Sequence, residues 1–121
     1  MTIEVLAVDD SRTMRDMISL ALSTEGFEVH LAEDGEHGLE VLDGIAPDVI
    51  ITDINMPKLD GFGFIDAVRE RDDCRTTPIL VLTTESSNDL KTRAREAGAT
   101  GWIVKPFAQD KLVRALRLVS G

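Results

Sequence analysis

Five short apolar runs alternate with five segments of helical periodicity along this chain of 121 residues. Strands that are separated by helices pair side by side in parallel, and their connecting helices cover both faces of the sheet. The pattern therefore predicts an α/β fold with a doubly wound sheet of five parallel strands and five helices. The expected strands cover residues 3–8, 27–31, 49–52, 79–82 and 101–104.

The composition of each run indicates where its strand lies in the sheet. The runs at 3–8, 49–52 and 79–82 are almost continuously apolar and rich in Val and Ile, which is typical of strands covered on both faces. The run at 27–31 alternates apolar and polar residues, which predicts an edge strand with one wetter face. This alternation alone accounts for His30.

The segments between the runs carry ordinary helix signals. Ser11, Asp34 and the polar stretch 86–89 are expected to cap three helices. Met14 and Met17 recur at helical spacing and are expected to pack in the core. The helix that follows residue 89 has only one large apolar residue, so we expect it to be the least firmly packed. The other residues expected to face inward are Ile18, Ala21, Leu22, Leu39, Leu42, Phe64, Ile65, Val68, Leu90, Ala94, Ala97, Leu112, Val113, Leu116 and Val119.

Composition excludes several classes of protein. The net charge of −9 argues against non-specific binding to nucleic acid. No apolar run approaches the roughly 18 residues of a membrane span, and no basic segment precedes an apolar one at the N-terminus. We therefore expect a single domain over residues 1–121 that is soluble and cytosolic. The one cysteine, Cys74, is expected to be a reduced thiol near the surface, and His37 to be solvated.

Residues suited to metal and phosphoryl chemistry follow four of the five runs: Asp9 and Asp10, Asp53, Thr83, and Lys105. The carboxyl ends of parallel strands meet at one edge of the sheet, so these side chains should converge there. Carboxylates about 4 Å apart repel by several kcal/mol at intermediate dielectric, and a divalent cation relieves that repulsion. An all-oxygen set suits Mg²⁺, and no cluster of His or Cys suggests zinc.

A carboxylate beside such a metal can act as a nucleophile toward phosphorus and form an acyl phosphate. The charge that develops then needs donors, and a lysine and a hydroxyl on neighbouring strands can supply them.

The chain resembles the receiver (CheY-like) family of response regulators over essentially its whole length. Four segments carry the resemblance, each at the end of a different strand. The resemblance implies the flavodoxin-like strand order 2-1-3-4-5 and a Mg²⁺ cofactor. The matching segments are Val8-Asp9-Asp10-Ser11, Asp53-Ile54-Asn55-Met56-Pro57 with Asp60-Gly61, Leu82-Thr83, and Lys105-Pro106-Phe107.

The resemblance assigns a role to each acidic residue. Asp53 is implied to be the phosphoryl acceptor. Asp10, the side chain of Asp53 and the main-chain carbonyl of Asn55 are implied to ligate Mg²⁺, with Asp9 acting through water. Asn55 and Glu85 occupy the positions that influence, in this family, how fast water removes the phosphoryl group.

The resemblance also assigns roles to residues on the fourth and fifth strands. Thr83 and Lys105 are implied to contact the phosphoryl oxygens, so that Asp53, Thr83 and Lys105 form the catalytic set. Thr83 and Trp102 are implied to form the switch, although the family usually has Tyr or Phe where this chain has Trp102. The bond before Pro106 is implied to be cis.

The closest likeness is to stand-alone receivers of the chemotaxis type, through Thr13-Met14-Arg15, Asn55 and Glu85. It implies a single-domain response regulator that receives its phosphoryl group from a histidine kinase. The implied target is a flagellar motor switch protein, or another phosphorelay protein if the chain is a relay intermediate or a phosphate sink. We expect a monomer without nucleic acid or membrane insertion.

The charge distribution suggests where the signal leaves the protein. Residues 86–121 hold 7 Lys and Arg against 3 Asp and Glu, a net charge of +4 within a chain of net charge −9. We expect an output face formed by the fourth helix, fifth strand and fifth helix, and a partner segment that is acidic with an apolar anchor. Its expected residues are Lys91, Arg95, Trp102, Lys111 and Arg114.

The residues argue against two other classes of protein. A Mg²⁺-dependent phosphohydrolase with an aspartyl nucleophile, as in the haloacid dehalogenases, needs a second Asp two residues after the nucleophile, where this chain has Asn55. A flavodoxin-like cofactor binder needs a Gly-rich loop after the first strand, where this chain reads Asp9-Asp10-Ser11-Arg12.

Overall fold

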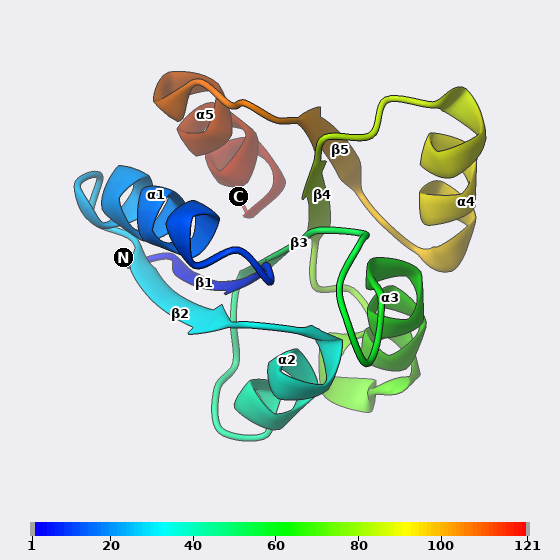
Figure 1. Cartoon of the computed structure of the whole chain (residues 1–121). Helices are drawn as coiled ribbons and strands as arrows, with labels where there is room; N and C mark the ends of the chain where they lie inside the picture. The colour runs from blue at the N-terminus through cyan, green and yellow to red at the C-terminus, as the bar shows by residue number, and fades with distance from the viewer. Residues whose placement is uncertain (1, 121) are drawn as a thin grey trace.

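The computed structural model of the protein describes residues 2–120 and contains one sheet of five parallel strands (Figure 1). The strand order is β2-β1-β3-β4-β5, which confirms the predicted topology and places the alternating run at an edge. Every strand lies within one residue of its expected bounds. The strands are β1 (Glu4–Val8), β2 (Glu28–Ala32), β3 (Val49–Thr52), β4 (Ile79–Thr83) and β5 (Gly101–Val104).

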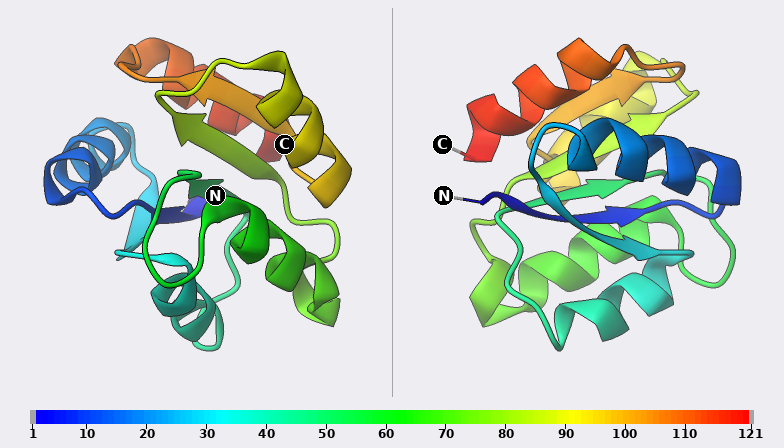
Figure 2. Two further views of the ribbon diagram at one scale, coloured as in Figure 1. Left: turned by 45° about the vertical axis from the view of Figure 1, so that its right-hand side comes forward. Right: turned by 90° about the vertical axis from the view of Figure 1, so that its left-hand side faces the viewer.

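Five α-helices cover the two faces of the sheet. Helices α1 and α5 lie on one face and α2, α3 and α4 on the other (Figures 1 and 2). The longest have 12 residues, and no helix within residues 2–120 is long and apolar enough to cross a membrane. The helices are α1 (Arg12–Ser23), α2 (Gly35–Leu42), α3 (Gly61–Glu70), α4 (Asn88–Ala97) and α5 (Gln109–Ser120), and a 3₁₀ turn (Asp72–Cys74) follows α3.

The central strands are buried on both faces. All four residues of β3 and all five of β4 are buried, whereas edge strand β2 has only one buried residue. Each large apolar side chain that is fully buried contributes about 1.5–3 kcal/mol. Packing on both faces therefore fixes the positions of the carboxyl ends of the central strands.

Helix caps fix the loops near those strand ends. Ser11, Asp34 and Ser87 each accept a hydrogen bond from the main-chain N–H three residues later, which confirms the three predicted caps. Asp60 caps α3 in the same way, through a bond of 2.9 Å from the N–H of Gly63. This fourth cap was not anticipated.

Helix α4 is held mainly through its C-terminal half. Its one buried residue is Ala94, whereas every other α-helix has at least three, so α4 is the least firmly packed helix, as predicted. Arg69 of α3 donates two hydrogen bonds, of 3.2 and 2.8 Å, to the carbonyl of Gly98, the left-handed residue that ends α4. The guanidinium of Arg93 lies 4.0 Å from the ring centroid of Phe62.

Two predictions about single side chains were wrong. Met17 is 44% exposed because it lies at the border of the apolar face of α1. Cys74 is 3% exposed, because the 3₁₀ turn folds its thiol into the cluster below α3. His37, which was expected to be solvated, is partly exposed, and its Nδ1 accepts a hydrogen bond of 3.1 Å from the N–H of Glu33.

Candidate functional site

The structure brings together the polar residues that follow four strands. Asp9 and Asp10 follow β1, Asp53 follows β3, Thr83 is the last residue of β4, and Lys105 follows β5. The four strands are consecutive neighbours in the sheet, so their carboxyl ends form one edge. Three of these residues, Asp9, Asp53 and Thr83, are at most 8% exposed. The site is therefore a recess at the carboxyl edge of the sheet, where the sequence predicted it.

Lys105 bridges two buried carboxylates. Its Nζ lies 2.7 Å from Oδ2 of Asp9 and 2.7 Å from Oδ2 of Asp53. The side chain of Lys105 is only 9% exposed, so water screens these ion pairs weakly. Charge-assisted bonds of this length are among the strongest hydrogen bonds in proteins. Lys105 consequently neutralises part of the charge at the site and holds both carboxylates in place.

The main chain orients the Asp53 carboxylate. The N–H of Asp53 donates to the carbonyl of Val8 at 3.0 Å, which joins the end of β3 to the end of β1. Oδ1 of Asp53 accepts the N–H of Ile54 at 2.6 Å, while Oδ2 accepts Lys105. Each oxygen therefore has a fixed donor, and the carboxylate has one defined orientation.

Asp9 is held by its own loop and by helix α1. Its Oδ1 accepts the N–H of Ser11 at 2.9 Å, and its main-chain carbonyl accepts Nη1 of Arg15 at 2.8 Å. Burial raises the pKa of Asp9 above its ordinary value of 3.8, against the opposing effect of its hydrogen bonds with Lys105 and Ser11. The buried carboxylate is therefore costly to ionise, and a cation beside it lowers that cost.

Three carboxylates converge at the site. Oxygen atoms of Asp9, Asp10 and Asp53 all lie within 4.8 Å of one another. Asp10 is exposed, in contrast to the other two, so a cation could enter from solvent on its side. Lys105 supplies only one positive charge to this group, and carboxylate oxygens are the ligands that Mg²⁺ prefers. The donor set thus fits a hard divalent cation of the Mg²⁺ type.

The predicted tuning and switch residues meet at the loop after β4. The carbonyl of Glu85 accepts the indole N–H of Trp102 at 2.9 Å, and its carboxylate accepts Nδ2 of Asn55 at 3.4 Å. The Thr83 hydroxyl is buried and accepts the N–H of Glu85 at 3.5 Å. One short loop is therefore connected to the acidic recess and to the aromatic residue of β5.

A close approach of main-chain segments beside Asp53 requires glycine at position 61. A Cβ on Gly61 would lie 2.7 Å from the Cα of Ile54 and closer still to the carbonyl oxygen of Asp53. The N–H of Gly61 also donates to the carbonyl of Ile54 at 2.8 Å. Gly61 therefore closes the loop that carries Asp53 and Asn55 back onto α3.

The predicted output residues fall into two groups. Lys91, Arg95 and Trp102 line one pocket of about 120 Å³ between α4 and β5. Arg114 instead lines a separate pocket of about 590 Å³ beside Glu25 at the end of α1, and Lys111 is exposed on α5. The structure thus brings together the α4 and β5 residues, while Arg114 belongs to another part of the surface.

Sequence reasoning missed the contacts of Arg15 and of the Ile54 N–H with this site. Arg15 stands four residues after Ser11, one helical turn into α1, which is the one signal that could have placed it beside the loop. The resemblance to receivers implied a cis peptide bond between Lys105 and Pro106, and the structure contains this bond.

The stability of the protein should depend on the ionisation of Lys105. Burial alone would lower the pKa of Lys105, but its hydrogen bonds to Asp53 and Asp9 outweigh burial and raise it above the ordinary 10.5. A group whose pKa is raised on folding stabilises the fold below its unfolded pKa, and this contribution is lost as the pH rises through the folded pKa. We expect the urea midpoint to fall above about pH 10.5. Urea titrations at several alkaline pH values measure it, and a Lys105→Met variant with the same alkaline slope would contradict the assignment.

The sequence of this chain matches the family model described as "Response regulator receiver domain" over residues 5–117. It is 38% identical over 120 residues to a probable chemotaxis protein CheY of Rhizobium etli, covering 98% of this chain and 93% of that protein. It is also 36% identical to the response regulator MprA of Mycolicibacterium vanbaalenii, covering 97% of this chain. The chain spans 50% of the length of MprA.

Solved structures agree with this relationship. The chemotaxis protein CheY4 of Vibrio cholerae is 45% identical, with a TM-score of 0.95 and coverage of 98% of this chain and 99% of that one. The receiver domain of the sensor histidine kinase PA1611 from Pseudomonas aeruginosa, 27% identical, has a TM-score of 0.92 and coverage of 100% and 99%. That structure has a magnesium ion coordinated in its active site cleft.

The matched region includes every residue of the acidic recess, and Asp9, Asp10 and Asp53 form a cluster typical of the Mg²⁺ site of receivers. The fold, the strand order and the full-length likeness point the same way. This chain belongs to the response regulator receiver domain family and is a phosphoryl-accepting module of two-component signalling, not a catalytic enzyme.

Proposed function

We propose that this chain is a single-domain response regulator, over residues 1–121, that accepts a phosphoryl group on Asp53 from a histidine kinase in the cytoplasm. The observation that carries the proposal is the buried Asp53 carboxylate, which Lys105 and the Ile54 N–H hold within 4.8 Å of two further acidic residues. A carboxylate fixed in this way is a positioned nucleophile rather than a solvated surface group.

The chemistry follows from these positions. An oxygen of Asp53 forms a bond to phosphorus as the bond from phosphorus to the donor histidine nitrogen breaks, and the bonding pair returns to that imidazole. Negative charge shifts onto the phosphoryl oxygens near Lys105, whose Nζ can exchange one carboxylate partner for a phosphoryl oxygen. The hydroxyl of Thr83 is the second donor for those oxygens.

The proposed Mg²⁺ ligands are Asp10, the side chain of Asp53 and the main-chain carbonyl of Asn55, with Asp9 acting through water. When bound, the ion neutralises charge on the carboxylates and on the incoming phosphoryl oxygens. The carboxylate cluster and the magnesium ion in the PA1611 receiver support this choice.

The proposal is tested by phosphorylation of the wild-type protein. Incubation with acetyl phosphate and Mg²⁺ should add the mass of one phosphoryl group, and chelation of the metal should suppress it. Hydroxylamine should remove the group, because it cleaves acyl phosphates and leaves phosphate esters of Ser and Thr intact. A modification that resists hydroxylamine, or that forms equally well in chelator, would overturn the proposal.

The signal would pass from Asp53 to the surface through the loop after β4. Thr83 ends β4 and Glu85 lies in the loop that follows, and the indole N–H of Trp102 donates to the Glu85 carbonyl. Movement of the Thr83 hydroxyl toward a phosphoryl oxygen would free the Glu85 N–H that it now meets at 3.5 Å. We propose that Trp102 responds to this change, and that Asn55 and Glu85 set the rate at which water removes the phosphoryl group.

The proposed output face consists of α4, β5 and α5. Its best supported part is the pocket that Lys91, Arg95 and Trp102 line, because two cations there flank an aromatic side chain. Such a surface suits an acidic segment with an apolar anchor. The likeness to the chemotaxis proteins CheY and CheY4 favours chemotaxis as the process, and the target that we propose is a flagellar motor switch protein. A relay intermediate or a phosphate sink is the alternative.

Charge reversal on this face is expected to weaken partner binding. Lys91→Glu with Arg95→Glu should slow association with the motor switch protein of the source organism, because complementary charge steers encounter. The loss should shrink as salt rises, while dissociation changes less. The experiment is kinetic binding with Asp53 in a fluoride complex that mimics the phosphoryl group.

A matched control reverses two exposed cations outside α4, β5 and α5, Lys58→Glu with Arg75→Glu, so that net charge changes equally. Wild-type association by the Lys91 and Arg95 double variant at every salt concentration would exclude this face. If the phosphorylated wild-type chain does not bind the motor protein at all, the relay or sink alternative replaces the chemotaxis proposal.

A further inference from the structure

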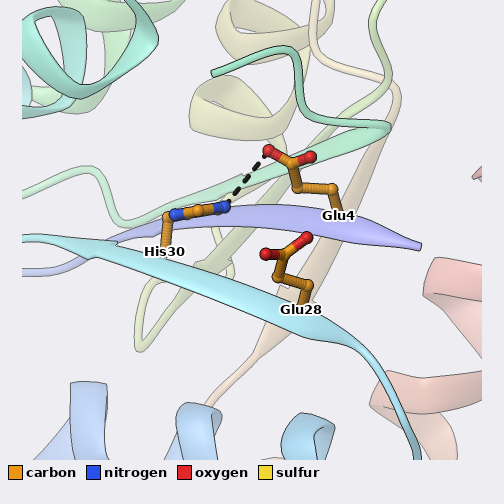
Figure 3. A group of neighbouring side chains, drawn as sticks. All are labelled: Glu4, Glu28 and His30. Carbon is orange, nitrogen blue, oxygen red and sulfur yellow. Dashed lines mark ion pairs between the residues drawn. The ribbon is translucent and has the colours of Figure 1, made fainter. Parts of the chain in front are cut away.

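A second group of ionisable side chains lies at the opposite end of the sheet from Asp53. Glu4 at the start of β1 faces Glu28 and His30 of β2 (Figure 3). An oxygen of each carboxylate and a ring nitrogen of His30 lie within 4.8 Å of one another. Nothing in the phosphoryl chemistry described above uses these three residues.

The strand register brings the three side chains onto one face. Glu4 pairs with Glu28, and Leu6 pairs with His30. Because side chains alternate along a strand, Glu4 and Leu6 share a face, as do Glu28 and His30. Leu6 packs in the cluster beneath α2 and α3, so the group lies on that face of the sheet. Strand pairing rather than sequence proximity creates it, which is why no metal-ligand spacing is visible in the sequence.

The charges within this group are poorly balanced. Like charges directly opposite each other on paired strands destabilise a sheet, and Glu4 and Glu28 are such a pair. Among residues 2–120, no Lys or Arg forms an ion pair with either carboxylate. The carboxylate of Asp48 also accepts the main-chain N–H of Glu4 at 2.8 Å, which adds negative charge nearby.

The ring nitrogen of His30 points into the group. Its Nε2 is shielded from solvent and has no hydrogen-bond partner among the described residues. It lies 3.1 Å from Oε2 of Glu4, at the distance of an ion pair but without the alignment of a hydrogen bond. A shielded ring nitrogen without a hydrogen bond is costly, and this atom is shielded although the His30 side chain as a whole is 29% exposed.

We propose that Glu4, Glu28 and His30 form a site for a divalent transition metal of the Zn²⁺ class. One imidazole nitrogen and two carboxylate oxygens are accepted zinc ligands, and water completes four-coordination. The imidazole distinguishes this site from the all-oxygen recess at Asp53, since nitrogen ligands favour Zn²⁺ over Mg²⁺. A bound ion would join edge strand β2 to β1 and remove the repulsion between the two glutamates.

Zinc titration by calorimetry in excess Mg²⁺ tests the proposal, because excess Mg²⁺ competes with Zn²⁺ for the all-oxygen recess but not for a site that includes an imidazole nitrogen. One Zn²⁺ per chain should bind. The variant His30→Gln should lose affinity by roughly tenfold or more, since even indirect partners of zinc ligands change affinity about 10–100-fold. The exposed Glu28 allows a second variant, Glu28→Gln, that leaves the core untouched and should also weaken binding.

The other histidine of the chain provides the matched control. His37→Gln should bind Zn²⁺ as the wild type does, and Zn²⁺ should shift the ring resonances of His30 in nuclear magnetic resonance spectra while those of His37 stay in place. The proposal fails if His30→Gln binds Zn²⁺ with wild-type affinity. It also fails if Zn²⁺ leaves the His30 resonances unmoved, in which case the contact between His30 and Glu4 is a contact between side chains only. Neither outcome bears on phosphorylation of Asp53, which is read separately by mass.

Discussion

The Asp53→Asn variant is expected to take up no phosphoryl group at the site under conditions in which the wild type is modified once per chain. Asparagine keeps the shape of the side chain and can still accept the Ile54 N–H that now lies 2.6 Å from Oδ1. It lacks the second carboxylate oxygen that could attack phosphorus, so the nucleophile is lost while the loop is preserved. Intact-protein mass spectrometry after incubation with acetyl phosphate and Mg²⁺ measures the result.

A suitable control is Asp66→Asn on the exposed side of α3, which removes the same charge away from the recess. This control should be modified as the wild type is. A full mass shift in Asp53→Asn would mean that another residue is the acceptor.

Replacement of Lys105 should have the largest effect on stability. The variant Lys105→Met keeps the apolar stem of the side chain but removes the ammonium that lies 2.7 Å from both Asp9 and Asp53. Removing one member of a buried ion pair leaves an uncompensated charge and costs about 3–5 kcal/mol. We expect urea denaturation without metal to show a loss of this size, and Mg²⁺ to restore part of it by neutralising the same carboxylates.

The matched substitution Lys111→Met changes an exposed lysine of α5 and should leave stability within about 0.5 kcal/mol. An unchanged urea midpoint for Lys105→Met in chelator would show that the two ion pairs contribute nothing to the fold. In Lys105→Met we expect phosphorylation of Asp53 to persist, because Lys105 does not hold the metal. Partner binding should be lost, because Lys105 communicates the presence of the phosphoryl group to the remainder of the fold.

The position of the site could be predicted from sequence because it depends on strand ends. A buried strand is recognisable by its apolar run, and the residue that follows it is then placed at the carboxyl edge, as happened for Asp9, Asp53 and Lys105. Helix caps can also be predicted from sequence, because a cap involves only neighbouring residues. Ser11 and Asp34 bond to main-chain groups three residues away, so their roles need no knowledge of the remainder of the fold.

What escaped prediction depends on packing between distant segments. Periodicity assigned Met17 to the apolar face of α1 but could not give the width of the covered strip, and the side chain is 44% exposed. The charged neighbours of Cys74 predict a thiol near the surface, yet the turn after α3 buries it. The Arg15 contact with the Asp9 carbonyl and the meeting of Glu4 with His30 arise only once strands and helices are placed in three dimensions.

The anchoring of α4 gives this helix the mechanics of a lever. Arg69 donates hydrogen bonds to the carbonyl of Gly98, which ends the helix. Ala94 is buried, and the guanidinium of Arg93 stacks on the ring of Phe62. The pivot point of the helix, its fulcrum, therefore lies in the C-terminal half. The ten residues of α4 extend over about 15 Å at 1.5 Å per residue. A shift in the loop before α4 would therefore tilt the helix about that fulcrum, with the greatest travel at its first turn.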